Sequence, residues 1–175
     1  MNELHFSPET TKAEIFEQTR AYLDNLNLGI ADVDDQRPWG GFFVISPDST
    51  DDFIEQYFPE LDKAEIYKYG SELSPKILLV QPEQKLSWQY HHRRAELWKA
   101  VLGPVAVYES MTDELPEAPR VLETGEAVQH DDLARHRLAG LGNWGVVAEI
   151  WQHTVEGQPS DEADIVRVSD DYNRS

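Results

Sequence analysis

Apolar residues first recur along the chain at the spacing of a helix. Residues 7–26 hold an apolar stripe made of Ile15, Phe16, Tyr22, Leu23 and Leu26. Positions three and four apart share one side of a helix, so this spacing predicts a helix over the segment. Ser7 or Thr11 can cap its N-terminus, and Pro8 suits the first turn.

A second helical pattern follows a short strand-like segment. Residues 41–46, GFFVIS, are predicted to form a strand, and turn residues begin the next segment, 47–62. Apolar side chains return there at helical spacing, at Phe53, Ile54, Tyr57 and Phe58. This pattern predicts a helix inserted between strands. Its aromatic residues are expected to pack in the core rather than to bind a ligand.

From residue 75 onward the spacing becomes that of strands. Short segments rich in β-branched and aromatic residues are separated by turn signals, at 76–82, 85–91, 96–103, 105–110, 120–130, 136–142 and 145–154. Regularly spaced short strands are typical of a β-sandwich or barrel. The pattern predicts one small all-β domain with an N-terminal helical addition. It leaves residues 161–175 as an acidic tail packed against that domain.

The composition fits one globular domain. The chain has 175 residues, of which 40% are hydrophobic, enough for a sizeable core. It has no cysteine, which excludes disulfides, thiolate metal ligands and cysteine nucleophiles. No apolar run is long enough to cross a bilayer, and the N-terminus lacks the basic and apolar segments of a signal peptide. We therefore expect a cytoplasmic protein without a membrane partner.

Net charge restricts the partners further. A formal charge of −18 opposes nucleic-acid binding, because phosphate neutralisation drives such binding. A small anion is not excluded, because a local field can oppose the net charge. Residues 76–99 are locally basic, with two carboxylates, Glu83 and Glu96, against five cations, Lys76, Lys85, Arg93, Arg94 and Lys99. An ordinary charged strand surface would have the same composition.

The stretch QKLSWQYHHRRAELW gathers groups that could bind a metal. Alternate residues of a strand share a face, so Gln89 and His91 project together. Glu96 has the wrong parity to join them on one continuous strand, but a reversal of the chain at HRRA would turn it toward the same interior. Another histidine, His136, begins a predicted strand forty residues after Glu96.

An amide oxygen, two imidazoles and a carboxylate would suit a divalent ion. Zinc, manganese, iron, cobalt and nickel all accept this mixture of nitrogen and oxygen ligands. An ion of five- or six-fold coordination would keep positions open for a substrate. The alternative is that His91 and His136 are unconnected surface or hydrogen-bonded histidines, since short motifs also match by chance.

These residues resemble the first motif of the cupin superfamily, in which a metal-binding residue, a histidine, a glutamate and a later glycine follow in order. The matching residues are Gln89, His91, Glu96 and Gly103, and His136 matches the histidine of the second cupin motif. The resemblance implies a double-stranded β-helix, the cupin jelly roll, with N-terminal and inserted helices.

Among cupins, the chain is most similar to type II phosphomannose isomerase domains. Five ordered segments carry the resemblance: RPWGG at 37–41, Lys76, LSWQYHHRRAELW at 86–98, HRL at 136–138 and DIVRVSDDYNR at 164–174. It implies a helical extension at 1–36 and a cupin domain at 37–175, with a helical insertion near 47–74. Small cupins are often dimers, so the resemblance also allows a homodimer.

Some positions depart from the family pattern. Glu83 stands where the family has a glycine, and Arg93 and Leu97 stand where it has histidines. The proline–glycine turn before the second motif is replaced by Asp131 and Asp132. All four implied metal ligands are retained, so the departures concern the substrate pocket and the identity of the sugar.

The resemblance implies a metal-dependent aldose–ketose isomerase of sugar phosphates, similar to mannose-6-phosphate isomerase. Such an enzyme moves a proton between C1 and C2 of the sugar through an ene-diol. One divalent ion is implied, zinc as the first choice and manganese, iron, cobalt or nickel as alternatives. Its implied ligands are Gln89, His91, Glu96 and His136.

The charged positions of the family also have counterparts. Lys76, Arg94 and Arg137 match them and are expected to bind phosphate or sugar oxygens, although each could form a surface salt bridge instead. His92 and Glu149 are the candidates for proton transfer. His92 adjoins a ligand and could titrate near neutrality, and Glu149 lies on a late strand that would border the pocket.

Two other functions compete with this hypothesis. A non-catalytic cupin would bind a sugar or sugar phosphate without turnover, and the substituted pocket positions favour it. An isomerase of another sugar phosphate, or another metal-dependent cupin enzyme such as an oxygenase, would share the fold, because a fold alone does not set the chemistry. Metal content and turnover before and after chelation would separate these functions.

Overall fold

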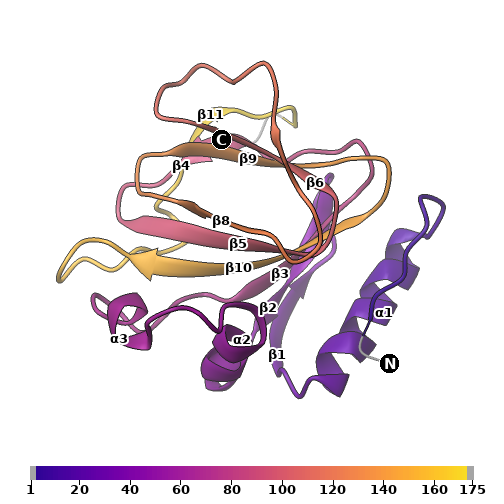
Figure 1. Cartoon of the computed structure of the whole chain (residues 1–175), viewed down its shortest axis with the longest axis horizontal. Coiled ribbons are helices and arrows are strands. Elements are labelled where there is room, and N and C mark those ends of the chain that lie inside the picture. The colour runs from indigo at the N-terminus through magenta and orange to yellow at the C-terminus, as the bar shows by residue number, and fades with distance from the viewer. Residues whose placement is uncertain (1–2, 173–175) are drawn as a thin grey trace.

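Two antiparallel sheets face each other in the computed structural model, which describes residues 3–172 (Figure 1). The six-stranded sheet has the order β1 (Ile30–Asp34), β2 (Gly40–Ile45), β3 (Lys76–Val80), β10 (Gly145–His153), β5 (Arg94–Leu102) and β8 (Ala127–His130). The five-stranded sheet has the order β11 (Val166–Ser169), β4 (Trp88–Tyr90), β9 (Arg135–Gly140), β6 (Val105–Ser110) and β7 (Arg120–Leu122). This architecture confirms the predicted all-β sandwich.

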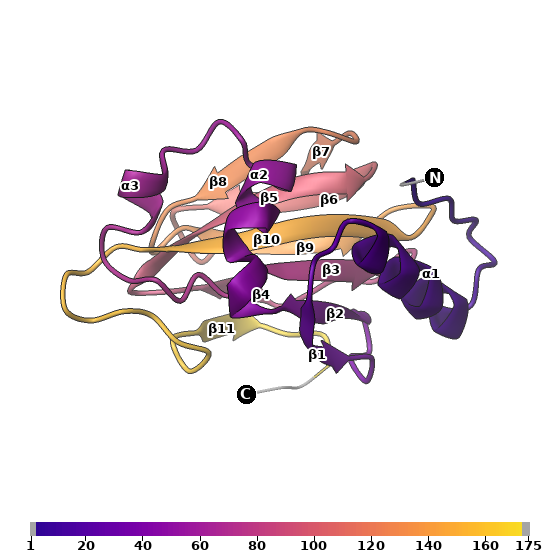
Figure 2. The same ribbon diagram turned by 90° about the horizontal axis from the view of Figure 1, so that it is seen from below.

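The helices lie on the outer face of the six-stranded sheet (Figure 2). The first, α1 (Lys12–Asn25), begins at Thr11, whose side chain accepts a hydrogen bond from the Glu14 backbone while the Glu14 carboxylate accepts one from the Thr11 backbone. This reciprocal capping box satisfies two N–H groups that a helix otherwise leaves unpaired. The helix predicted over 7–26 is therefore confirmed, with Thr11 as its cap.

The second predicted helix is shorter and divided. A 3-10 turn, η1 (Pro47–Ser49), leads into α2 (Thr50–Tyr57), and a further short helix, α3 (Lys63–Ile66), follows. Phe53, Ile54 and Tyr57 are buried against the sheet, as their spacing predicted. None of the helices in the described part of the chain is long and apolar enough to span a membrane.

Alternation along β3 shows how the sheet separates two environments. Ile77 and Leu79 belong to the cluster packed under the helices, while Leu78 and Val80 belong to the cluster between the sheets. Lys76 has the parity of Leu78 and so also projects between the sheets. The space between the sheets is apolar toward one end and polar toward the other, where Lys76 lies.

Two strands were not predicted. β1 lies in a segment that is polar and half exposed, and β11 lies within the acidic region treated as a tail. Both are edge strands of their sheets, so they pair on one side only and need little hydrophobic patterning. The segment predicted as one strand at 120–130 forms β7 and β8, which belong to different sheets. The last two residues of the motif at 164–174 lie outside the described residues.

Candidate metal centre and its cavity

The turn between β4 and β5, which belong to different sheets, makes the reversal that the sequence required. Its turn covers residues 91–93, and the Asp164 carboxylate accepts hydrogen bonds from the backbone N–H groups of His92 and Arg93, each at 3.0 Å. Ser160 donates a third hydrogen bond to this carboxylate at 2.7 Å. The conformation of this turn is thus fixed by a residue more than seventy positions further along the chain.

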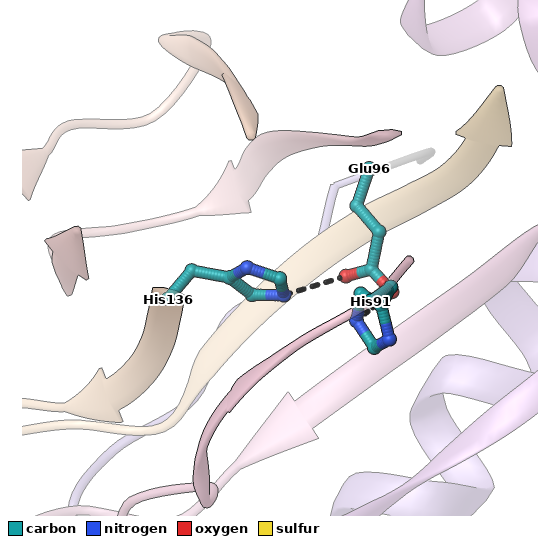
Figure 3. A group of neighbouring side chains, drawn as sticks. All are labelled: His91, Glu96 and His136. Carbon is teal, nitrogen blue, oxygen red and sulfur yellow. Dashed lines mark ion pairs between the residues drawn. The ribbon is translucent and has the colours of Figure 1, made fainter. Parts of the chain in front are cut away.

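Three predicted ligands meet between the two sheets. His91 follows β4, Glu96 lies on β5 and His136 lies on β9, and their ligand atoms all lie within 4.8 Å of one another (Figure 3). His91 Nε2 is 2.9 Å from one Glu96 carboxylate oxygen, and His136 Nε2 is 3.2 Å from the other. All three side chains are at most 2% exposed.

The backbone orients both imidazoles. His91 Nδ1 lies 2.7 Å from the carbonyl oxygen of Asp164, and His136 Nδ1 lies 2.9 Å from that of Ala134. A carbonyl can only accept, so each Nδ1 carries a proton, and the Nε2 atom of each ring faces Glu96. Metal-binding histidines are commonly held in this way.

Three buried atoms at this point lack a hydrogen-bond partner among the residues the structure describes. They are His91 Nε2, His136 Nε2 and Glu96 Oε2, whose close approaches do not have hydrogen-bond angles. Unpaired buried polar atoms are uncommon and can mark a missing ion. Two imidazole nitrogens and a carboxylate form a donor set that zinc and other transition metals accept, so these residues fit a divalent ion.

The charges of the three groups are strongly linked. Burial works to raise the pKa of Glu96, but the adjacent imidazoles of His91 and His136 outweigh it and hold that pKa well below its ordinary value. Burial likewise works to lower the pKa of His136, yet the Glu96 carboxylate raises it above its ordinary value. A metal ion would therefore compete with a proton at His136.

The fourth predicted ligand, Gln89, lies beside this group. Gln89 pairs directly with His136 across β4 and β9, and it lines the same cavity as Glu96. Its side-chain oxygen accepts a hydrogen bond from the Ser87 hydroxyl at 2.5 Å. The structure thus assembles three of the four predicted ligands and places the amide of the fourth next to them.

Arg94 lines the cavity beside Glu96, and its guanidinium is also bonded to the protein. Its Nε donates to Glu96 at 3.0 Å, and its Nη1 donates to Ser160 and to the Asp161 carbonyl at 3.0 and 2.8 Å. Its guanidinium also lies 3.8 Å above the ring of Trp151. Arg94 therefore holds the Glu96 carboxylate in position, and its predicted contact with substrate stays a prediction.

A cavity of about 120 Å³ opens beside Glu96. Lys76, Arg37 and Arg167 bring positive charge to its wall, and Glu149 and Glu162 bring negative charge. Lys76 was predicted here from the sequence. Arg37 and Arg167 were missed, although both lie in segments that carried the family resemblance, RPWGG and DIVRVSDDYNR.

Glu149 is a buried carboxylate with a strongly raised pKa. It is buried, lines the cavity and accepts a hydrogen bond from Trp98 Nε1 at 2.9 Å. Burial, with a smaller contribution from the charge of Glu96, raises the pKa of Glu149 to about 7. This predicted residue can therefore both accept and donate a proton near neutral pH.

Two other predicted residues lie away from the cavity. His92 is exposed in the turn between β4 and β5, with its ring against Tyr90. Arg137 is buried but follows His136 on a regular strand, so its side chain points out of the sandwich, where it lies 3.8 Å from Asp171. Neither residue lines the cavity beside Glu96.

A further histidine, which was not predicted, packs behind His136. The ring of His130 stacks on the ring of His136 with centroids 4.6 Å apart, and its Nδ1 pairs with the Glu109 carboxylate. Burial, together with the nearby charge of His136, lowers the pKa of His130 to about 4. Its position directly across from Glu96 on β8 could be found only from the strand register.

A family model described as "Mannose-6-phosphate isomerase C-terminal" matches residues 54–170, two thirds of the chain. This segment contains all the residues that meet at the candidate metal centre. Comparison with curated proteins gives no significant match.

Solved structures with similar folds include the capsular polysaccharide assembling protein CapF from Staphylococcus aureus. One CapF structure is 13% identical with a TM-score of 0.51 and covers 89% of this chain and 36% of CapF; another is 12% identical with a TM-score of 0.50, over 78% and 33%. A Cupin 2 barrel protein from Salinispora arenicola is 19% identical with a TM-score of 0.38, over 45% of this chain and 60% of that one. This chain spans about a third of CapF, and the likeness shows the fold alone.

Proposed function

This chain belongs to the family of mannose-6-phosphate isomerase C-terminal cupin domains, and from that premise we propose that it is a metal-dependent aldose–ketose isomerase of a sugar phosphate. The observation that carries the proposal is the buried group of His91, Glu96 and His136, with unpaired donor atoms directed at one point beside a cationic cavity. Mannose 6-phosphate is the substrate that the family description suggests.

The three buried donors would hold one divalent ion, with zinc as the first choice and manganese, iron, cobalt or nickel as alternatives. Gln89 would supply a further oxygen after its amide leaves the Ser87 hydroxyl. When bound, such an ion supplies Lewis-acid stabilisation of the negative charge that develops on substrate oxygens during enolisation. Arg94 keeps the Glu96 carboxylate directed toward the ion position.

Glu149 would carry the proton between C1 and C2 of the sugar. It lines the cavity, and a pKa of about 7 lets it take a proton from one carbon and return it to the other without a large penalty in either direction. Trp98 holds one carboxylate oxygen, so the other can face the substrate. This proton-transfer role is assigned to Glu149 because His92 lies outside the cavity.

The phosphate would bind to the cations of the cavity wall. Lys76 is almost completely buried there, and Arg37 and Arg167 line the same space. A guanidinium can pair with two phosphate oxygens at once. Arg94 and Arg137 are less suited to this role, because one is occupied by Glu96 and the other faces away.

A second candidate function is sugar-phosphate binding without turnover. The observation that favours it is the change at positions near the motifs, where Glu83 replaces a family glycine and Arg93 and Leu97 replace histidines. The metal donors are kept while these positions differ, a combination that suits a protein that binds its ligand without converting it. Binding of mannose 6-phosphate with no product formation would favour this function.

The test combines metal analysis with turnover. Purified protein should contain a divalent metal, and it should interconvert mannose 6-phosphate and the corresponding ketose phosphate until a chelator removes the metal. His136→Ala should lose both metal and turnover. His5→Ala, which removes an exposed histidine, is the matched control. Unchanged metal content in His136→Ala would contradict the metal assignment, and a metal-loaded protein without turnover would contradict the isomerase.

A further inference from the structure

Lys76 is already paired with an anion, one that comes from the protein itself. Its Nζ donates to the Glu162 carboxylate at 2.8 Å and to the Ser74 hydroxyl at 2.9 Å. The Lys76 side chain is 7% exposed, whereas the Glu162 side chain is 73% exposed. A buried cation in a ligand cavity is thus neutralised by a carboxylate that reaches in from the surface.

Glu162 also stands between two cavities. It lines the 120 Å³ cavity beside Glu96 and, on its other side, a cavity of about 730 Å³. The residues around it follow the same division: Lys76 lines the smaller cavity, while Ser74 and Pro75 line the larger one. The Lys76–Glu162 pair therefore forms part of the partition between them.

The two cavities differ in charge. The smaller one is lined by several cations, as described above. The larger one has no lysine or arginine among the described residues that line it; its wall combines carboxylates with apolar side chains such as Val44, Leu73 and Trp151. An anionic group suits the first cavity and a neutral group suits the second.

We infer that the Glu162 carboxylate occupies the position of the ligand's anionic group at Lys76, and that its displacement joins the two cavities into one binding site. The ligand class that fits the joined site is a sugar carrying a phosphate or carboxylate at one end and a neutral, partly apolar extension at the other. The inference rests on the proposed function only in taking an anionic sugar as the ligand.

Local contacts allow Glu162 to move alone. Its neighbours are held firmly, since Arg94 contacts the Asp161 carbonyl and Asp164 is bound to the backbone of the turn between β4 and β5. Only the Glu162 side chain must leave Lys76; that carboxylate is largely exposed and returns to water, while an incoming anion keeps the buried lysine paired. A phosphate, with more charge and more acceptor oxygens than a carboxylate, would replace it.

The first experiment measures binding of inorganic phosphate to the metal-loaded protein by calorimetry, with tryptophan fluorescence as a second readout because Trp151 lies 4.5 Å from the Lys76 ammonium. Glu162→Gln should bind phosphate about fivefold more tightly than the unaltered chain. Glu156→Gln, the same change at an exposed residue of the same loop, should bind as the unaltered chain does. Lys76→Met should bind phosphate at least about tenfold more weakly.

The second experiment tests the joined site. In Glu162→Gln, mannose 6-phosphate with a neutral aryl group at C1 should bind at least about tenfold more tightly than mannose 6-phosphate, because the extension buries apolar surface. Ser71→Trp, which narrows the larger cavity from its exposed edge, should remove that gain and leave phosphate binding unchanged.

Two results would overturn the inference: equal phosphate affinity in Glu162→Gln and Glu156→Gln, or no gain from the aryl extension. Neither measurement requires turnover. Failure of the isomerase assay would therefore contradict the proposed function and leave this inference to be judged by binding alone.

Discussion

The two faces of the six-stranded sheet have opposite characters, although the same strands build both. On β10, Ala148 and Ile150 face the helices and join the apolar cluster there. Glu149 and Trp151 face the opposite way, where Glu149 lines the cavity beside Glu96 and Trp151 lines the larger cavity. Residues one position apart therefore serve stability and chemistry separately. The division of tasks follows the side of the sheet rather than the region of the chain, so adjacent substitutions can test it.

Glu149→Gln should give the largest effect on the inner face. Removing the titrating carboxylate while keeping its size should lower kcat for sugar-phosphate isomerisation by about 10²–10⁴-fold. Metal content should not change, because Glu149 is not among the three donors. Steady-state kinetics with parallel metal analysis measures both. A variant with undiminished kcat would show that another group carries the proton.

Ile150→Ala tests the neighbouring position on the outer face. Ile150 is fully buried under the helices, so truncation should lower the free energy of unfolding by about 2–5 kcal/mol. At a temperature where the variant stays folded, metal affinity and kcat should match the unaltered protein. Urea unfolding and kinetics on the same preparation check this. A large loss of kcat without a loss of stability would break the separation of the two faces.

Two groups on the inner face, Glu149 and His130, should change the stability of the protein with pH in opposite directions. The pKa of Glu149 is raised to about 7, so its contribution favours the folded state at low pH and is lost as the pH rises from about 4.5 to 7. The pKa of His130 is lowered to about 4, so its contribution is lost as the pH falls below about 6.5. In the chelated protein the two contributions largely offset each other.

Substitution should reveal each contribution in turn. As the pH rises from 5 to 6.5, the free energy of unfolding of chelated His130→Gln should fall by an amount on the order of 2 kcal/mol. Over the same rise in pH, that of chelated Glu149→Gln should increase by about the same amount. Urea unfolding midpoints at the two pH values measure the slopes. Slopes of the same sign in both variants would contradict the assignment of the two shifted pKa values.

Arg94→Gln should produce a smaller effect, a loss of metal affinity that acts through Glu96. Loss of the hydrogen bond to Glu96 should lower metal affinity about 10–100-fold, as is typical when the partner of a ligand is removed. Arg135→Gln removes an arginine whose partner, Asp113, belongs to an exposed pair, and it should leave metal affinity unchanged. Competition with a chromophoric chelator compares the two variants. Equal affinities would mean that Glu96 keeps its position without Arg94.

The sequence predicted the parts of the site that depend on local periodicity. Parity along β4 placed Gln89 and His91 on one face, and the need to bring in Glu96 located the chain reversal before β5 correctly. The helix beginning at Thr11 followed from its cap and its apolar stripe. These features are set by residues within a few positions of one another, which is why a single sequence was sufficient.

The features that sequence analysis missed depend on pairing between distant segments. Arg37, Arg167 and Glu162 reach the cavity only because the turn before β2, the strand β11 and the loop before β11 lie against it, and no local pattern marks those contacts. Arg137 was assigned to substrate through its motif, although the parity of a regular strand turns it away from His136. The register between strands, rather than composition, decides which charged residues enter the cavity.

The carbonyl oxygens that orient His91 and His136 belong to the main chain at Asp164 and Ala134. Amino-acid replacement cannot delete a backbone acceptor, provided that the local path of the chain is kept. Substitution of the surrounding side chains therefore leaves the orientation of the two imidazoles unchanged. The side chains of Lys76, Arg37 and Glu162 can themselves be replaced. A lineage built on this scaffold could exchange one ligand for another by altering the cavity wall while its centre persists.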